Sequence, residues 1–291
     1  MTIRHLPVLM REVTDLLSIV EGGTYVDATT GLGGHSEAML QKVGNQGRVI
    51  GVDRDAEALR MTAERLHDSR LILKKGKFSE LEDLLASEEI MHVDGILFDL
   101  GVSMMQLKDL TRGFSFHSPD RLDMRMDGAA GLSAWDVVNR YPEKDLIRIL
   151  KEYGEERAAP RIARAIVHYR GKKSVDTCAE LEDIVFHAAG RRGRVHPATK
   201  TFQALRIEVN REVGELQEGL ASSLKILKRG GRLCVISYHS LEDRTVKNFI
   251  RDNAKKGVLR PLLKKPITPA FEEVRENPSS RSAKLRGAER L

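Results

Sequence analysis

The sequence predicts an α/β fold: a mostly parallel sheet with helices on both faces, interrupted by an inserted all-helical domain. Apolar segments alternate with helical segments over the first hundred residues, which is typical of such a covered parallel sheet. Between residues 106 and 211 no segment has a convincing strand pattern, and helical periodicity dominates. The α/β pattern then resumes. We therefore expect one domain from residues 1–105 and 212–291, and an inserted domain from residues 106–211.

Five segments are predicted to be strands because they are short, apolar and bounded by turn residues. In chain order they are Gly23–Asp27, Arg48–Asp53, Leu71–Lys74, Val93–Asp99 and Arg232–Ser237. The last forty or so residues carry Pro266, Pro269 and Pro278 and are harder to assign. Ligands of open α/β sheets bind outside the carboxyl ends of the strands, so the residues that end these segments are the first candidates for a site.

Helices are predicted from capping residues and apolar periodicity. Ser36 is expected to cap a helix that ends before Gly44, and Ser79 to cap a helix through Leu85. Further helices are expected at residues 56–66, 201–228 and 241–253.

One helix of the predicted insertion has a basic face. Pro160 suits its first turn, and Ile162 and Ile166 then share an apolar face. Another face carries Arg161, Arg164 and His168. This face either contacts nucleic acid or is an ordinary solvated surface, and the sequence leaves both interpretations open.

The positive charge of the chain is concentrated in its C-terminal stretch. The net charge is +6 over 291 residues. From Arg244 to Leu291 there are 13 Lys and Arg against 5 Asp and Glu, which gives +8 and leaves −2 for the remainder. Concentrated basic charge suits a polyanion such as nucleic acid, and a solvated basic tail is the alternative.

Composition favours a reducing compartment. No segment approaches the roughly 20 apolar residues of a membrane span, and Met1–Pro7 lacks the apolar run of a signal peptide. Cys178 and Cys234 are too few for a disulfide framework or a four-thiolate site. No His, Cys and Asp cluster has metal-ligand spacing. We therefore expect a cytoplasmic protein with no metal and no membrane partner.

The most informative segment is the Gly-rich turn Asp27–Ser36. Glycines between a strand and a helix let a ligand approach the backbone closely. Gly31 and Gly33 match the start of a dinucleotide motif, but Ser36 stands where that motif has its third glycine. The pair Gly33–Gly34 after an acidic residue instead resembles the first motif of class I methyltransferases.

Three later residues favour a nucleoside cofactor. Asp53 ends the second predicted strand, where its carboxylate can accept both ribose hydroxyls. Phe78 follows the third strand, where its ring can stack on adenine, and Asp99 ends the fourth. Each residue alone could be a surface acid or a core aromatic, but their joint placement at successive strand ends points to one site.

The residues expected on the substrate side of the site each allow more than one interpretation. Asp99 is the candidate catalytic residue, because transfer to an exocyclic amine needs an acceptor for the amine N–H; alternatively it only orients the cofactor. Arg112–Phe116 combines a cation with two aromatics, which either hold a nucleotide or anchor the insertion. Ser237–Asp243 lacks the Gly-x-Ser-x-Gly turn of a hydrolase and is expected to close the crevice after the fifth strand.

Read together, these motifs resemble the bacterial MraW family of small-subunit ribosomal RNA methyltransferases (methyltransferase H). The resemblance covers nearly the whole chain. The matching segments are Asp27–Ser36, Phe98–Ser103, Arg112–Phe116, Leu122–Asp127, His196–Thr199, Phe202–Ile207, Val209–Asn210, Val235–Arg244, Asn277–Pro278 and Ser280–Arg286. Small departures are Met104–Met105 where Ser-Pro is expected, Arg121 where Pro is expected, and Tyr238 in place of a usual Phe.

The resemblance implies a class I, Rossmann-like methyltransferase fold with an inserted helical domain for substrate recognition. It also implies S-adenosylmethionine as cofactor, bound by Gly33, Gly34, His35, Asp53, Phe78, Asp99 and Gln106. The expected reaction is methylation of the N4 amine of a cytosine in the decoding region of 16S rRNA, free or in the small ribosomal subunit. A homodimer stays open, as do two rival functions: a non-enzymatic ribosome-assembly factor and a small-molecule methyltransferase.

Overall fold

The computed structural model describes residues 7–102, 105–106, 109–116, 118, 120–190 and 196–291. The chain forms two compact units, one from Met1–Gly101 with Val213–Leu291 and one from Val102–Glu212. Each unit has its own hydrophobic core. No helix in the described part of the chain is long and apolar enough to cross a membrane.

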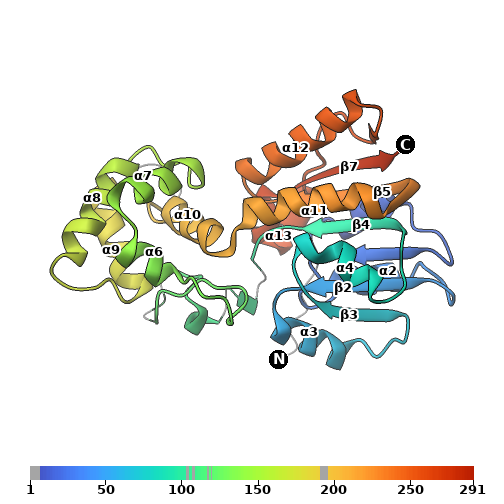
Figure 1. Ribbon diagram of the computed structural model, residues 1–291, viewed down its shortest axis with the longest axis horizontal. Helices are drawn as coiled ribbons and strands as arrows, with labels where there is room; N and C mark the ends of the chain where they lie inside the picture. The colour runs from blue at the N-terminus through green and yellow to red at the C-terminus, as the bar shows by residue number, and fades with distance from the viewer. Residues whose placement is uncertain (1–6, 103–104, 107–108, 117, 119, 191–195) are drawn as a thin grey trace. The chain divides into compact units, whose positions relative to one another are not determined.

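The first unit is built around a seven-stranded sheet in the order β3-β2-β1-β4-β5-β7-β6 (Figure 1). The strands are β1 (Thr24–Asp27), β2 (Arg48–Asp53), β3 (Leu71–Lys75), β4 (Val93–Asp99), β5 (Leu227–Ser237), β6 (Leu259–Pro261) and β7 (Lys284–Arg290). Strands β1 to β5 run parallel, and β7 is antiparallel to both β5 and β6. This arrangement confirms the class I methyltransferase fold.

Helices cover both faces of the sheet. They are α1 (Met10–Leu17), α2 (Gly34–Leu40), α3 (Ala56–Arg65), α4 (Leu81–Ala86), α11 (Glu212–Ile226), α12 (Ser240–Lys255) and α13 (Phe271–Glu276), with short 3₁₀ turns at Phe78–Glu80 (η1) and Pro278–Ser282 (η3). In β4, Ile96 and Phe98 pack with α4 and α11, whereas Leu97 packs with α1 and α2. This alternation explains why the strand is apolar throughout: it is buried on both faces.

The second unit is helical in its described residues. It contains the 3₁₀ turn η2 (Leu110–Arg112) and helices α6 (Ala134–Arg140), α7 (Glu143–Glu152), α8 (Ala159–Arg170), α9 (Cys178–Ala189) and α10 (Thr199–Asn210). Ser133 and Thr177 cap α6 and α9 in capping boxes, which the sequence analysis did not predict. Pro160 lies in the first turn of α8, as the sequence predicts. Ile162 and Ile166 are buried in the core of this unit.

Three predicted helix boundaries were wrong: in two of them a tertiary contact takes the expected capping side chain, and in the third the helix is broken. Helix α2 is capped by Gly33 at φ +77° rather than by Ser36, whose hydroxyl instead donates to Asp27 Oδ2 at 2.7 Å. Ser79 lies in η1, and its hydroxyl donates to Glu215 Oε2 at 2.9 Å. The single helix expected over residues 201–228 is two helices, α10 and α11, separated by Arg211 at φ +50°.

Candidate active site at the carboxyl edge of the sheet

The predicted site residues of the first unit lie at or next to the carboxyl ends of neighbouring strands. Asp53 ends β2, and Asp99 ends β4. Phe78 opens the turn after β3, while Gly33, Gly34 and His35 begin α2 after β1. Gln106 belongs to the second unit, where it is buried.

The two adjacent glycines are required for steric reasons. A Cβ at Gly33 would lie 2.7 Å from Thr62 Cγ2, and one at Gly34 would lie 2.6 Å from Pro7 Cγ. Gly31, at φ +50°, has no close neighbour, and its nearest atom would be 3.9 Å away. The loop is therefore packed against protein at Gly33 and Gly34 and open at Gly31, which is where a ligand can approach the backbone.

Asp53 fastens the end of β2 to this loop. Its Oδ2 accepts a hydrogen bond from Gly31 N at 2.7 Å, and its Oδ1 accepts one from Asp55 N at 2.9 Å. Burial raises the pKa of Asp53 from 3.8 to about 6, although both hydrogen bonds act in the opposite direction. Each carboxylate oxygen has two lone-pair sites, so Asp53 retains acceptor capacity for hydroxyl donors.

Asp27 is a fully buried carboxylate at the start of the loop. It fixes the loop through hydrogen bonds, a role that the sequence analysis did not assign to it. It accepts hydrogen bonds from Ser36 Oγ at 2.7 Å and from Thr29 N at 3.2 Å. Burial, the largest influence, raises the Asp27 pKa. The signal was present in the sequence as an acid at a strand end, the same pattern that identified Asp53 and Asp99.

The Asp99 carboxylate is held on both oxygens. Tyr238, directly after β5, donates its hydroxyl to Oδ1 at 2.9 Å, and His35 Nε2 lies 3.5 Å from Oδ2. The Asp99 backbone N–H donates to Thr29 Oγ1 at 2.7 Å. Burial alone would lower the His35 pKa, but Asp99 and Asp27 together raise it above its ordinary value. Tyr238 is thus part of the site, a role that its place in the sequence, where the resembling family usually has Phe, did not predict.

The Phe78 ring is half-buried and fixed by its neighbours. It packs edge-on against Phe98 with ring centroids 5.1 Å apart, and the guanidinium of Arg54 lies 5.8 Å from its centroid. A Cβ at Gly219 of α11 would lie 2.5 Å from Phe78 Cβ, so only glycine leaves room there. Glu215, one helical turn earlier, accepts the hydrogen bond from the Ser79 hydroxyl.

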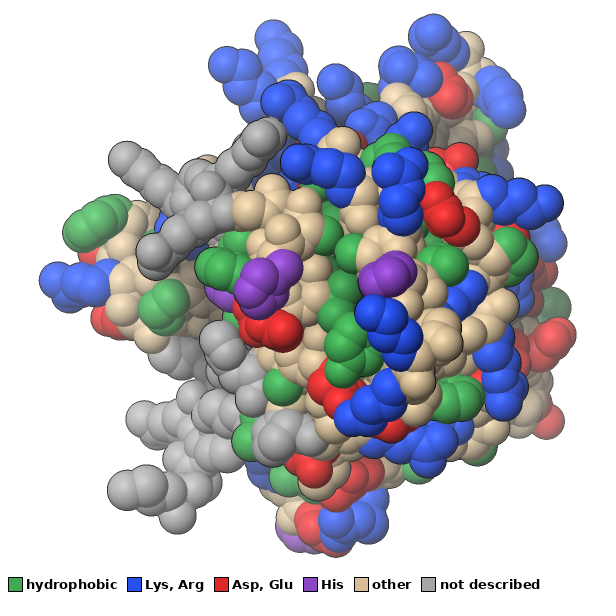
Figure 2. Space-filling model, turned by 90° about the vertical axis from the view of Figure 1, so that its left-hand side faces the viewer, with side chains coloured by type: hydrophobic (Ala, Val, Ile, Leu, Met, Phe, Trp, Pro, Cys, Tyr) green, Lys and Arg blue, Asp and Glu red, His purple; other side chains and the backbone are tan. Residues whose placement is uncertain are grey.

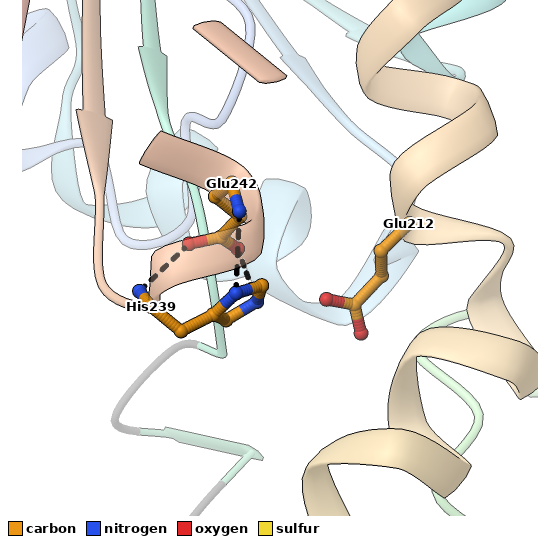
Figure 3. A group of neighbouring side chains, drawn as sticks. All are labelled: Glu212, His239 and Glu242. Atoms are coloured by element: carbon orange, nitrogen blue, oxygen red, sulfur yellow. Dashed lines mark hydrogen bonds and ion pairs between the residues drawn. The ribbon is translucent and has the colours of Figure 1, made fainter. Parts of the chain in front are cut away.

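The segment after β5 caps a helix rather than forming a nucleophile site. His239 is the N-cap of α12, and its Nδ1 accepts a hydrogen bond from Glu242 N at 3.3 Å (Figure 3). Glu242 Oε2 in turn accepts the backbone N–H groups of Tyr238 at 2.8 Å and His239 at 3.3 Å. This capping box fixes the backbone from which the Tyr238 ring projects.

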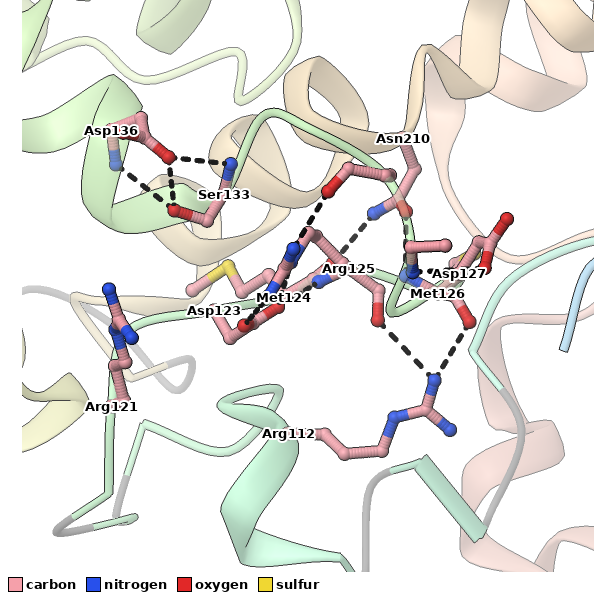
Figure 4. A network of polar contacts seen from close by, with 12 residues as sticks. Arg112, Arg121, Asp123, Met124, Arg125, Met126, Asp127, Ser133, Asp136 and Asn210 are labelled. Atoms are coloured by element: carbon pink, nitrogen blue, oxygen red, sulfur yellow. Dashed lines mark hydrogen bonds and ion pairs between the residues drawn. The ribbon is translucent and has the colours of Figure 1, made fainter. Parts of the chain in front are cut away.

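In the second unit, Arg112 stabilises the chain rather than pointing to solvent. Its guanidinium donates to the carbonyl oxygens of Met126 at 2.8 Å and Arg125 at 3.4 Å (Figure 4). Phe114 is buried in the core, and Phe116 stacks on His196 with centroids 4.5 Å apart. These contacts support the anchoring interpretation of Arg112–Phe116. Ser103 and Met104 of the neighbouring motif lie outside the described residues.

The residues at the carboxyl edge fit S-adenosylmethionine. Both ring nitrogens of His35 are buried without a hydrogen-bond partner among the described residues; Nε2 lies near Asp99 Oδ2, and a polar ligand group can supply a partner for Nδ1. Asp27, Asp53 and Asp99 place three carboxyl groups at one edge, which suits a ligand that carries a positive sulfonium and an ammonium. Phe78 offers a ring to stack on a base.

Sequence comparison decides the family. The MraW methylase family matches residues 2–291 of the chain. The chain belongs to this family. A ribosomal RNA small subunit methyltransferase H from Sulfurihydrogenibium sp. (strain YO3AOP1) is 48% identical, with 99% of this chain and 100% of the relative covered. The enzyme of the same name from Persephonella marina is 49% identical over the same shares.

The MraW membership confirms the resemblance drawn from the motifs. The protein is a methyltransferase, and its cofactor is S-adenosylmethionine. Among solved structures, a rRNA methylase from Streptococcus thermophilus matches with a TM-score of 0.46 at 13% identity, with 99% of each chain covered.

Proposed function

We propose that the protein methylates the N4 amine of a cytosine in the decoding region of 16S rRNA. The observation that carries this proposal is the Asp99 carboxylate at the end of β4, held by Tyr238 and His35, in a chain whose relatives are named small-subunit rRNA methyltransferases. An exocyclic amine needs a fixed acceptor for its N–H, and Asp99 supplies one.

In this mechanism the protein positions groups and excludes water. S-adenosylmethionine, when bound, would supply a methyl group on a positively charged sulfur: the nitrogen–methyl bond would form as the sulfur–methyl bond breaks, leaving a neutral thioether, and the amine would give up one proton to the acceptor of its N–H. Asp99 accepts a hydrogen bond from the amine N–H, so that the nitrogen lone pair leaves conjugation with the ring. Tyr238 and His35 fix the carboxylate by contacts at 2.9 Å and 3.5 Å, so it need not reorganise when the amine arrives.

The cofactor residues of this proposal are those that the sequence predicts, except Asp99, which we assign to the substrate amine instead. Asp53 accepts the ribose hydroxyls, Phe78 stacks on adenine, and the backbone around Gly33, Gly34 and His35 lines the amino-acid end. We assign Gln106 a cofactor contact as well. The loop opening at Gly31, the Asp53 acceptor sites and the unpartnered His35 Nδ1 support these assignments.

We propose that small-subunit RNA is the partner and that the basic C-terminal stretch contacts it. β6 runs parallel to β5, so it ends toward the same edge as Asp99 and Ser237. The exposed Lys264 and Lys265 follow β6, between the backbone contacts of Leu262 with Gly287 and Ile267 with Leu285. We further propose that the inserted unit recognises the RNA, that the enzyme acts in the cytoplasm, and that it forms a homodimer.

The direct test is mass mapping of modified nucleosides in 16S rRNA from cells that lack the protein. We expect loss of a methyl group from the exocyclic amine of one decoding-region cytosine, and its return on complementation with the wild-type gene. Asp99→Asn should bind S-adenosylmethionine but fail to restore the modification. Expression of Arg60→Gln, which removes only an exposed ion pair with Glu64, is the matched control and should restore it. Unchanged modification in the deletion strain would refute the assignment.

A further inference from the structure

We propose that Arg161, Arg164 and His168 of α8 form a phosphate-binding stripe for the backbone of the RNA substrate. The inference rests on the proposed function, because it assigns a surface of the inserted unit to that RNA. For this face the sequence allows two interpretations, contact with nucleic acid or an ordinary solvated surface.

The stripe is a single exposed ridge. Ile162, Ala163 and Ile166 of α8 are buried in the core, whereas Arg161, Arg164 and His168 are exposed. Spacings of three and four residues place the exposed side chains in one row along the helix. At 1.5 Å per residue the row from Arg161 to His168 is roughly 10 Å long. Figure 2 looks at the side of the molecule where α8 is labelled in Figure 1, and it shows many blue Lys and Arg side chains on that side, with fewer red Asp and Glu side chains among them.

The two arginines of this row differ from others of the same unit in having no partner. Among the described residues, neither Arg161 nor Arg164 makes an ion pair or a side-chain hydrogen bond. Elsewhere in the unit arginines are paired with carboxylates: Arg125 with Asp123 at 2.7 Å, Arg140 with Asp136 at 2.8 Å and Arg148 with Glu208 at 3.6 Å. The sequence of α8, APRIARAIVHYR, contains no acidic residue that could serve.

The fold itself gains nothing from this charge. Arg161 lies in the first turn of α8, at the positive end of the helix dipole, where a cation is unfavourable. That turn has no acidic residue of its own, and the nearest carboxylate in sequence, Glu156, accepts a hydrogen bond from Ala158 N at 2.7 Å rather than pairing with Arg161. Arg164 then adds a like charge one turn further on, which disfavours the helix. No described contact gives the two arginines a structural role, so a ligand is the simplest reason for their presence.

The chemistry of the row selects a phosphate polymer. Guanidinium groups present paired N–H donors that match two phosphate oxygens at once, whereas a lysine ammonium acts as a point charge. A row of such groups follows a chain of successive phosphates better than it fits one compact anion. Helix α8 itself contributes no carboxylate that would repel such a chain.

The experiment compares Arg161→Gln/Arg164→Gln with Lys144→Gln/Lys151→Gln. The control pair removes the same charge from exposed positions of the same unit, on α7, where acidic residues stand nearby. RNA affinity is measured by fluorescence anisotropy with a protein-free decoding-region fragment across a salt series, and melting temperature is measured in parallel. We expect the arginine pair to weaken binding about tenfold or more and to reduce the salt slope by about one to two units. The lysine pair should leave both unchanged.

The melting temperature separates this interpretation from a structural role. Loss of the arginines should leave it unchanged or raise it, because two unfavourable charges leave the helix. A lower melting temperature with unchanged salt slope would overturn the proposal. Weaker binding to intact small subunits, but not to the protein-free fragment, would also overturn it, because the stripe would then bind a ribosomal protein. Methyl transfer by the wild-type enzyme is scored separately, so failure of the proposed reaction is distinguishable from failure of the stripe.

Discussion

The hydroxyl of Tyr238 donates to Asp99 Oδ1 at 2.9 Å, while His35 Nε2 lies 3.5 Å from the other oxygen of the same carboxylate. Groups from the starts of α2 and α12 thus meet at the end of β4. The ring of Tyr238 also lies beside Gly101, whose Cβ, if present, would be 3.3 Å from Tyr238 Cδ2. Two consequences can be measured.

We expect Tyr238→Phe to lower the free energy of unfolding by about 1–2 kcal/mol, because it removes a hydrogen bond to a charged group and nothing else. Single-turnover methyl transfer should slow severalfold, by less than in Asp99→Asn. The matched control is Tyr141→Phe, which removes a similar bond, to Glu208 Oε1 at 2.9 Å, in the inserted unit. That control should lose stability but keep the rate. Equal rates for wild type and Tyr238→Phe would exclude a positioning role for the hydroxyl.

His35 should make stability depend on pH above neutrality. Burial alone would lower its pKa, but the hydrogen bond and charge of Asp99, with the charges of Asp27 and Glu273, raise the pKa overall. A raised histidine pKa gives stability that is fully present below the unfolded value near 6.5 and is lost as pH rises through the folded value. Urea unfolding from pH 6.5 to 9 should show a decline in wild type that is smaller in His35→Gln. Parallel pH curves for the two proteins would contradict this.

Asp53 should control cofactor affinity at lower pH. Burial raises its pKa from 3.8 to about 6, so the carboxyl group becomes protonated as pH falls below 6. Calorimetric titration should show affinity for S-adenosylmethionine falling by up to about tenfold per pH unit below that point. Asp53→Ala should weaken binding at pH 7.5 by roughly 1.5–3 kcal/mol and remove the pH dependence. A wild-type affinity that stays flat from pH 7.5 to 5 would remove the Asp53 charge from the binding site.

Gly219→Ala tests whether the position of Phe78 matters. The added Cβ would lie 2.5 Å from Phe78 Cβ, so the ring must move from its place against Phe98. We expect a loss of cofactor affinity on the order of 1 kcal/mol, comparable with Phe78→Ala, because base–aromatic stacking contributes roughly 1–3 kcal/mol. Gly128→Ala, at a glycine with no atom within 4 Å of the added Cβ, is the control. If Gly219→Ala and Phe78→Ala both bind S-adenosylmethionine like wild type, Phe78 is a core residue only.

The fold could be predicted from the sequence wherever local pattern and tertiary contacts agree. β4 is a continuous apolar segment, and it is a strand because both of its faces are buried. The break at Arg211 was missed because no Gly or Pro marks it. There Asn210 accepts a hydrogen bond from Met126 N and donates to the carbonyl of Met124, and these long-range bonds hold the end of α10.

The C-terminal strands were missed for a related reason. β7, KLRGAER, has four charged residues out of seven and no sustained apolar alternation. It is a strand because it pairs with β5 along six residues, and because Asp243 accepts a hydrogen bond from Arg286 at 2.6 Å. The candidate site was easier to predict than these strands, since acids at strand ends are visible locally. Tyr238 could not be given a role, because its partner Asp99 is 139 positions away.

The last prediction concerns the basic C-terminal stretch, where two exposed lysine pairs carry the same charge at different positions. Comparing them separates the effect of position on RNA binding from the effect of net charge. Lys264 and Lys265 follow β6 toward the carboxyl edge of the sheet, whereas the equally exposed Lys255 and Lys256 precede β6 and lie toward the opposite edge. If RNA approaches the edge that holds Asp99, Lys264→Gln/Lys265→Gln should weaken RNA binding and reduce the salt slope by about one to two units. Lys255→Gln/Lys256→Gln removes the same charge and should have little effect. Affinity for S-adenosylmethionine should be unchanged in both, because no contact in the described part of the chain joins these lysines to the Gly-rich loop. Equal losses in the two variants would mean that net charge alone attracts the RNA. No loss in either would mean that the stretch is only a solvated surface, and α8 would then carry the phosphate contacts.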